Sequence, residues 1–264
     1  INLYNSVGNA YMAELVEVVG YADSLLSADS FQDYCPNGLQ VEGRASIRRL
    51  ISGVTASRAF LEAALEEGAD ALLVHHGYFW KGEDSRVTGM KRERLKLLLS
   101  GDISLLAYHL PLDAHPEYGN NAQLARVLDF TVEDRFEGDP QGTGLALYGR
   151  PPGPMDPHGL SAHLASRLGR MPLHIDGGGK QIRTVGWCTG AAQSFIEAAV
   201  KQGVDAFVSG EISEPTVHVA RECGIHYYAA GHHATERYGV EALGTHLAEH
   251  FNIEHRFFDI DNPV

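Results

Sequence analysis

Apolar residues along this chain follow two alternating patterns. In LLVHHGYFW (72–80) a short apolar run ends abruptly at two histidines and a glycine, which is typical of the end of a buried strand. In FLEAALEEGADA (60–71) the apolar residues recur at helical spacing up to Gly68, which predicts an amphipathic helix with a glycine at its end. Strands that alternate with helices in this way predict a parallel sheet with right-handed crossovers.

The pattern occurs twice. FIEAAVKQGVDA (195–206) is identical to residues 60–71 at seven of twelve positions. A strand-like run precedes each copy, RRLISGVTAS in the first and RTVGWCTGAA in the second. A helix follows each copy, near 90–99 or 214–222, and then another strand. The sequence therefore predicts an α/β fold of two pseudo-repeated lobes, with mostly parallel sheets flanked by helices.

The segment between the copies is rich in glycine and proline. DPQGTGLALYGRPPGPMDPHGL (139–160) predicts a loop, a short strand and a proline-initiated helix near 157–168. The glycines of GDPQGTG (138–144) are interpreted as turn residues, because the segment lacks the GxxxxGK[ST] pattern of a phosphate loop. The predicted division is a first lobe at 1–130, a second lobe at 131–264, and peripheral decoration of the second lobe at 131–180.

Composition narrows the functional classes. A formal net charge of −13 argues against general nucleic-acid or anionic-membrane binding, which depends on accumulated Lys and Arg. No apolar run approaches the roughly 18 residues of a membrane helix, and INLYNSVGNAYMAEL lacks the basic and apolar segments of a secretory signal. Cys35, Cys188 and Cys223 are odd in number, widely spaced and without a CxxC pair, which predicts buried reduced thiols in a cytoplasmic protein.

Histidines and carboxylates follow several predicted strands. When the two halves are aligned, His109 matches His232 and Asp113 matches Glu236, so that each half ends a strand with His-x-x-x-carboxylate. Ligands of parallel α/β sheets gather at these carboxyl ends. Imidazoles and carboxylates without thiolates suit Zn, Mn or Fe.

The adjacent pair His75 and His76 can be interpreted in two ways. Successive side chains of a strand point to opposite faces, so one histidine could be packed and the other hydrated. Alternatively, each imidazole binds a different ion of a dinuclear site, in which the ions lie about 3.5–4 Å apart and share a bridging carboxylate. The second interpretation explains why both residues are histidine.

Five segments in order resemble the YbgI-like members of the bacterial Nif-three-like family, known as GTP cyclohydrolase 1 type 2 homologues. They are YCPNGLQVEG (34–43), VHHGYFWKGE (74–83), HLPLDAHPEYGNNAQLA (109–125), SGEISE (209–214) and GHHATERYG (231–239). The resemblance implies a toroidal homohexamer of two-lobed subunits, each with two divalent metal ions (Zn, Fe or Mn). The metal ligands that it implies are His75, His76, Asp113, His232 and Glu236.

Other residues near these motifs have two interpretations each. His109 is either an extra ligand or a donor that orients Asp113. Glu211 matches His76 in the repeat, so it serves either the site or a plain strand end, and His233 is a surface or supporting group. Four further residues also have two interpretations: Tyr78, Trp80, Lys81 and Arg237. In the first, the aromatic side chains form a wall for the substrate and the cations bind an anionic group. In the second, the aromatic side chains only pack and the cations form surface salt bridges.

The leading functional hypothesis is a metal-dependent hydrolase that uses a bridging hydroxide. Its small-molecule substrate, by resemblance, is a purine nucleotide such as GTP. One alternative is a metal-handling or metal-insertion protein with the same ligands. Another is a hexameric scaffold or regulatory protein without catalysis.

Overall fold

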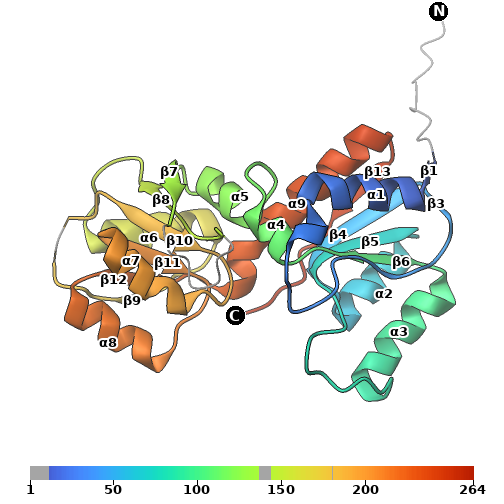
Figure 1. Cartoon of the computed structure of the whole chain (residues 1–264), viewed down its shortest axis with the longest axis horizontal. Coiled ribbons are helices and arrows are strands. Elements are labelled where there is room, and N and C mark those ends of the chain that lie inside the picture. The colour runs from blue at the N-terminus through green and yellow to red at the C-terminus, as the bar shows by residue number, and fades with distance from the viewer. Residues whose placement is uncertain (1–11, 137–143, 180) are drawn as a thin grey trace, which may run out of the picture. The chain divides into compact units, whose positions relative to one another are not determined.

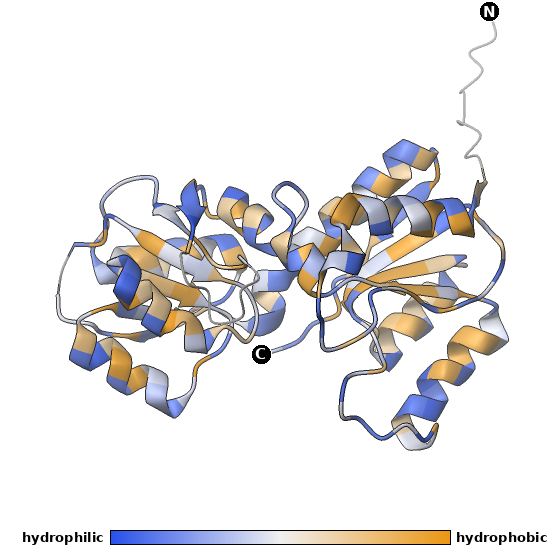
Figure 2. Ribbon diagram, viewed as in Figure 1, coloured by the Kyte–Doolittle hydropathy of each residue, from blue (hydrophilic) through white to orange (hydrophobic). Residues whose placement is uncertain are grey.

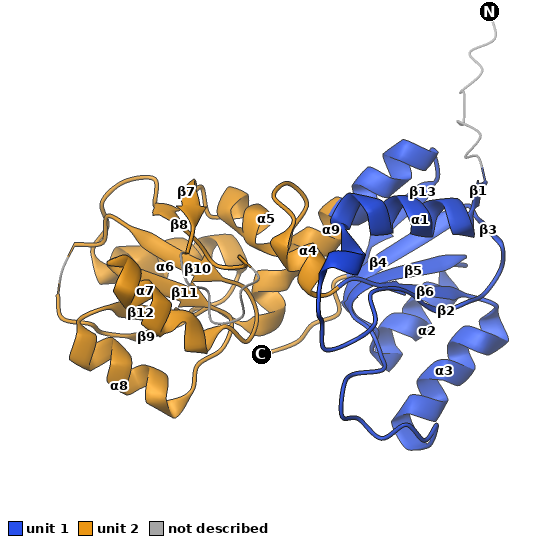
Figure 3. Ribbon diagram, viewed as in Figure 1, with its two compact units in different colours: residues 1–108, 243–258 blue, residues 109–242, 259–264 orange. Residues whose placement is uncertain are grey.

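The computed structural model describes residues 12–136, 144–179 and 181–264. The expectations about the N-terminal segment, up to residue 11, and about most of GDPQGTG lie outside these ranges. Among the described residues, no helix combines the length and the apolar character that crossing a membrane requires. The chain forms two compact units (Figure 3): unit 1 is Ile1–Tyr108 with Leu243–Phe258, and unit 2 is His109–Ala242 with Asp259–Val264.

Unit 1 is built on a five-stranded sheet with the order β13-β4-β5-β6-β2 (Figure 1). The strands β13, β4, β5 and β6 are parallel, and β2 is antiparallel at the edge. The strands are β2 (Gly38–Val41), β4 (Arg49–Thr55), β5 (Ala71–His76), β6 (Ser104–Ala107) and β13 (Glu254–Phe257), with the small pair β1 (Ala13–Glu14) and β3 (Ser46–Ile47). The helices are α1 (Leu15–Leu26), η1 (Ala28–Ser30), α2 (Arg58–Glu66) and α3 (Gly89–Gly101).

Unit 2 has a six-stranded sheet with the order β7-β8-β10-β11-β12-β9. Its three central strands β10, β11 and β12 are parallel, and the flanking strands are antiparallel. The strands are β7 (Thr131–Arg135), β8 (Leu147–Arg150), β9 (Leu173–Ile175), β10 (Val185–Cys188), β11 (Ala206–Ser209) and β12 (His226–Ala229). The helices are α4 (Leu110–Ala114), α5 (Asn120–Val127), α6 (Pro157–Leu168), η2 (Gln193–Phe195), α7 (Ile196–Gln202) and α8 (Glu214–Cys223), and α9 (His232–Phe251) begins in this unit.

The α/β class is confirmed, and the sequence repeat corresponds to a structural repeat. The series β4-α2-β5-α3-β6 in unit 1 matches β10-α7-β11-α8-β12 in unit 2. Asp70 accepts hydrogen bonds from the backbone amides of residues 48 and 49, both at 2.9 Å. Its counterpart Asp205 accepts bonds from the amides of residues 183 and 184, at 2.9 and 3.0 Å. In each unit the repeated aspartate thus satisfies backbone donors near the start of the first repeat strand.

The segment 131–180 is not peripheral, contrary to the sequence-based expectation. Its strand β8 pairs with β10, and β9 pairs with β12. The predicted helix near 157–168 is α6, and Leu160 and Leu164 on it are fully buried in a core cluster that includes Trp187. A three-stranded repeat sheet leaves edges and an apolar face uncovered, and this segment covers them. Figure 2 shows the apolar residues concentrated in the central strands of each unit.

Two further expectations differ from the structure. The chain passes from unit 1 to unit 2 at His109, before the predicted boundary near 130, and Leu243–Phe258 returns to unit 1. The reason is that β13 pairs with β4 and completes the first sheet, although no pattern in the repeat marks it. Cys35 and Cys188 are buried free thiols as expected, but Cys223, the last residue of α8, is exposed.

His255 makes the stability of unit 1 dependent on pH. Burial lowers the pKa of its imidazole from 6.5 to about 4, and Ser52 Oγ lies 2.8 Å from Nε2. The neutral form is therefore favoured in the folded state. Its stabilisation is complete above pH 6.5 and is lost as the pH falls from 6.5 towards 4.

We expect the free energy of unfolding to fall by roughly 1–2 kcal/mol from this group between pH 7 and pH 5, at about 1.4 kcal/mol per pKa unit. Urea unfolding of wild type and His255→Gln at both pH values measures this contribution. The variant should lose less stability than wild type on acidification. Equal losses in the two proteins would show that His255 does not titrate in this way.

Candidate metal centre

The histidine pair lies at the carboxyl end of β5 in unit 1. His75 is fully buried, and its Nδ1 lies 2.9 Å from the carbonyl oxygen of Tyr108. Since a carbonyl can only accept, Nδ1 carries the proton, and the lone pair of the neutral ring is on Nε2. His76 is half-buried, with its Nδ1 3.2 Å from Thr55 Oγ1. Both imidazoles are thus oriented through Nδ1, as metal-binding histidines commonly are.

The two rings lie close together although the residues are neighbours on a strand. Their centroids are 4.5 Å apart and the rings are tilted by 45°. The next residue, Gly77, allows the chain to pass close to β2 and β6, because a Cβ there would lie 2.2 Å from Gln40 Oε1 and 2.6 Å from Ala107 Cβ. The end of β5 therefore presents two imidazoles in one place.

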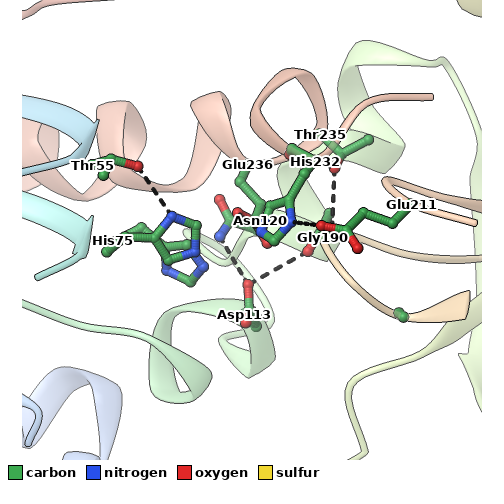
Figure 4. A network of polar contacts seen from close by, with 12 residues as sticks. Thr55, His75, Asp113, Asn120, Gly190, Glu211, His232, Thr235 and Glu236 are labelled. Atoms are coloured by element: carbon green, nitrogen blue, oxygen red, sulfur yellow. Dashed lines mark hydrogen bonds and ion pairs between the residues drawn. The ribbon is translucent and has the colours of Figure 1, made fainter. Parts of the chain in front are cut away.

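Asp113 in unit 2 is a buried carboxylate on the short helix α4. Its side chain is oriented by neutral donors. Asn120 Nδ2 donates to Oδ1 at 2.8 Å (Figure 4). Thr189 Oγ1 also donates to Oδ1, at 3.4 Å. Asn120 in turn accepts the backbone N–H of Gly239 at 3.1 Å. These two donors are uncharged, so they orient the carboxylate without adding a charge of their own.

Sequence reasoning missed the two asparagines that organise this region. Asn120 and Asn121 are fully buried, on the first turn of α5. Asn121 Oδ1 accepts the amide of Thr189 at 3.0 Å, and its carbonyl oxygen accepts Trp187 Nε1–H at 3.0 Å. The signal was present in the letters GNN within the third motif, since two adjacent amides are unusual in a helix that faces a core.

A second group of charged side chains surrounds the start of α9. The Nδ1 of His232 lies 2.7 Å from Glu211 Oε1, and its Nε2 lies 3.1 Å from Glu236 Oε2 (Figure 4). Burial lowers the pKa of His232, but hydrogen bonds to Glu236 and Glu211 and their charges outweigh burial and raise this pKa to about 9. At this pKa both nitrogens of the ring carry protons near neutral pH. Glu211 holds the Nδ1 proton, so a metal would bind this ring through Nε2 by displacing the proton there.

Gly190 provides the space for Glu236. Its backbone has a φ of +66°, and a Cβ at this position would lie 2.1 Å from Glu236 Oε1 and 3.2 Å from His232 Nε2. Its amide donates to Thr235 Oγ1 at 3.1 Å, on the first turn of α9. The loop after β10 therefore packs directly on the carboxylate, with no room for a side chain.

The remaining residues near the motifs lie in varied environments. His109 is half-buried at the start of α4, and its carbonyl oxygen accepts the amide of Asp113 at 3.1 Å. His233 is buried, with Nε2 2.7 Å from Asp259 Oδ1. Arg237 donates to Asp259 Oδ2 at 3.0 Å and to the carbonyl of Leu168 at 2.9 Å. Asp259 thus pairs with both His233 and Arg237.

The aromatic residues after the histidine pair differ in how deeply they are buried. Tyr78 is buried and its hydroxyl donates to the carbonyl of Ala56 at 2.8 Å, as the packing interpretation expects. Trp80 is half-buried, its ring centroid is 6.0 Å from that of His76, and its Nε1–H donates to Gly77 O at 3.2 Å. Lys81 is exposed.

The donor set fits a divalent metal of borderline character. The residues whose side chains could hold an ion are His75 and His76 with Asp33 and Cys35 in unit 1, and His109, Asp113, His232 and Glu236 in unit 2. Burial and the charge of Asp33 raise the pKa of the Cys35 thiol to about 12, which keeps this thiol protonated. The other candidate ligand atoms are imidazole nitrogens and carboxylate oxygens, which suit Zn, Mn or Fe.

Comparisons with known proteins identify the family of the chain. The model of the family Duf34/NIF3 (NGG1p interacting factor 3) matches residues 13–263. A Pseudomonas aeruginosa protein named GTP cyclohydrolase 1 type 2 homolog is 58% identical over 251 residues, which cover 95% of this chain and 98% of that protein.

Two solved structures have the same fold. One is described as "protein ybgI, unknown function"; it has a TM-score of 0.91 and 49% identity, over 96% of this chain and 100% of that chain. The other is TTHA1606 from Thermus thermophilus, with a TM-score of 0.86 and 36% identity over the same shares of the two chains. The chain belongs to the Duf34/NIF3 family.

Proposed function

We propose that the protein is a metal-dependent hydrolase that binds two divalent ions through His75, His76, Asp113, His232 and Glu236. The observation that carries the proposal is the orientation of the imidazoles. Nδ1 of His75 lies against a carbonyl oxygen, and Nδ1 of His232 lies against a carboxylate. With Nδ1 of each ring held by an oxygen acceptor, an ion would bind each ring through Nε2, as in metal sites whose histidines are oriented by a carbonyl or a carboxylate.

Divalent ions in such a site supply an activated water near neutral pH and polarise the group under attack. The residues of the chain have separate parts in this proposal. Asn120 and Thr189 orient Asp113, while Glu211 holds the proton on Nδ1 of His232. The similar proteins named GTP cyclohydrolase 1 type 2 homolog favour a purine nucleotide such as GTP as the substrate. We also propose a cytoplasmic homohexamer, which rests on the family resemblance.

Removing the charge of Glu211 should weaken metal binding although Glu211 is not a ligand in this proposal. We expect Glu211→Gln to reduce metal affinity about 10–100-fold, the usual effect of losing a carboxylate that supports a metal-bound histidine. Competition with a chromogenic chelator measures the affinity.

Glu214→Gln is the matched control, because Glu214 and His218 also form a carboxylate–imidazole contact of 2.7 Å, but on an exposed helix surface. Its affinity should equal that of wild type. An unchanged affinity in Glu211→Gln would contradict the supporting role of Glu211.

Hydrolysis itself is tested by turnover. Protein loaded in turn with Mn, Fe or Zn is incubated with nucleotides, esters and cyclic amides, and products are followed by mass spectrometry. The proposal predicts turnover that is lost in Glu236→Gln. If loaded wild-type protein with two ions per chain turns over no compound, the hydrolase proposal fails, and metal handling becomes the better interpretation.

A further inference from the structure

We propose that unit 2 contains a binding cavity for a nitrogen heterocycle that carries an anionic group. The ring would lie against Met171 and Leu173, the anion would bind Arg170, and a ring N–H would donate to Glu211. This inference rests on the proposed function, since it assigns a place to the organic part of the substrate.

The cavity has a volume of about 550 Å³, within the roughly 300–1,000 Å³ of small-molecule sites. It is lined by residues 170–173, 210–212, 229 and 231, and 263–264. β11 ends at Ser209 and β12 ends at Ala229, so the cavity lies at the carboxyl ends of two central parallel strands. This is the position at which open α/β sheets bind ligands.

One wall of the cavity is apolar and unusually exposed. Met171, Leu173 and Val264 are 67%, 55% and 57% exposed, which places them among the most exposed large apolar residues of the described chain. Ile212 lines the same cavity. A gathering of exposed apolar side chains at a cavity is typical of a binding surface, and side chains of this kind can cover the face of a planar ring.

The cation of the cavity is held in place. The guanidinium of Arg170 lies against Gly231, where φ is +103° and a Cβ would lie 2.4 Å from Nη1. Nη1 donates to the carbonyl of Pro263 at 2.8 Å. A guanidinium has five N–H donors in a fixed fork, so a guanidinium fixed through Nη1 retains donors for a phosphate or carboxylate.

Glu211 joins the cavity to the candidate metal centre. Its Oε1 contacts Nδ1 of His232, and its side chain is 35% exposed at the cavity wall. The second carboxylate oxygen can accept a ring N–H, because an ionised carboxylate has several acceptor sites. The cavity thus combines an acceptor, a cation and an apolar wall, which together match an N–H-bearing heterocycle with an anionic group.

The test uses the full-length protein, with and without bound metal, and two probes: GMP, and guanosine, which lacks the anion. Calorimetry should show that GMP binds whether or not metal is present. Arg170→Gln should weaken GMP binding at least tenfold and leave guanosine binding unchanged. Leu173→Asp, on an exposed position of the edge strand β9, should weaken both probes at least tenfold.

Arg150→Gln serves as the control, because Arg150 is an exposed arginine of the same unit that pairs with Glu133. It should bind both probes as wild type does. Absence of GMP binding, or wild-type binding in both cavity variants, overturns the inference. Metal content is measured on the same samples. A normal metal content without GMP binding overturns only the cavity, whereas GMP binding by a protein that takes up no metal on reconstitution overturns only the proposed function.

Discussion

Gly190→Ala is expected to abolish high-affinity metal binding without removing any ligand. A Cβ at this position would lie 2.1 Å from Glu236 Oε1, and real Cβ atoms do not approach so closely. Glu236 is only 3% exposed, and the added Cβ would displace its carboxylate from the position beside His232. We expect the affinity for Zn or Mn to fall at least 100-fold, since displacing a ligand costs more than losing a supporting hydrogen bond.

Gly203→Ala separates this effect from backbone strain. Gly203 also has a positive φ, +76°, but no atom lies within 4 Å of the position of its Cβ. Both variants should lose about 1 kcal/mol of stability from the left-handed backbone. Only Gly190→Ala should lose metal in chelator competition. Wild-type affinity in Gly190→Ala, or equal losses in the two variants, would contradict the role assigned to Glu236.

Asp70→Ala should cause a large loss of stability in unit 1. The carboxylate accepts the amides of residues 48 and 49 and pairs with Arg44 at 2.6 Å. Alanine leaves the two amides without their acceptor near the start of β4, an interior strand of the sheet. We expect the free energy of unfolding to fall by about 2–4 kcal/mol, at about 1–2 kcal/mol for each of the two donors, the lower part of the range for buried groups, because both hydrogen bonds are half-buried.

Glu62→Ala is the control, since Glu62 forms an exposed i,i+4 pair with Arg58. It should change the stability by less than about 0.5 kcal/mol. Chemical denaturation monitored by circular dichroism measures both variants. A loss below 1 kcal/mol in Asp70→Ala would show that water replaces the carboxylate, and that the repeated aspartates do not stabilise the strands.

The repeat made most of the fold predictable. Identical letters in 60–71 and 195–206 predicted two strand–helix–strand series, and both are present, with Asp70 and Asp205 in the same role. What lay outside the repeat was not predictable in this way. β13 is far in sequence from β4, and β8 is surrounded by glycine and proline. Pairing of distant strands depends on which sheet edge is left open, and local pattern carries no information about that.

The part of the candidate site that is formed by neighbouring residues in the sequence was predictable. Adjacent histidines, and carboxylates at fixed spacing from a histidine, are visible as letters. Their support was less visible: Asn120 and Thr189 contact Asp113 from separate segments, and Gly190 gives Glu236 its space. Arg237 is a residue whose neighbour in sequence suggested a role in the site. In the structure its guanidinium instead donates to Asp259 and to a backbone carbonyl. Contacts across long stretches of chain decide such roles.

The most direct test of the central claim is metal content per chain, measured by elemental mass spectrometry on protein purified without chelators or nickel resin. Wild type, Asp113→Ala and the exposed control Asp134→Ala are compared after reconstitution with Mn, Fe or Zn. The account predicts about two ions per chain in wild type and in Asp134→Ala, and a sharp fall in Asp113→Ala. Near zero in every sample, or the same content in Asp113→Ala as in wild type, would contradict a dinuclear centre built on these ligands.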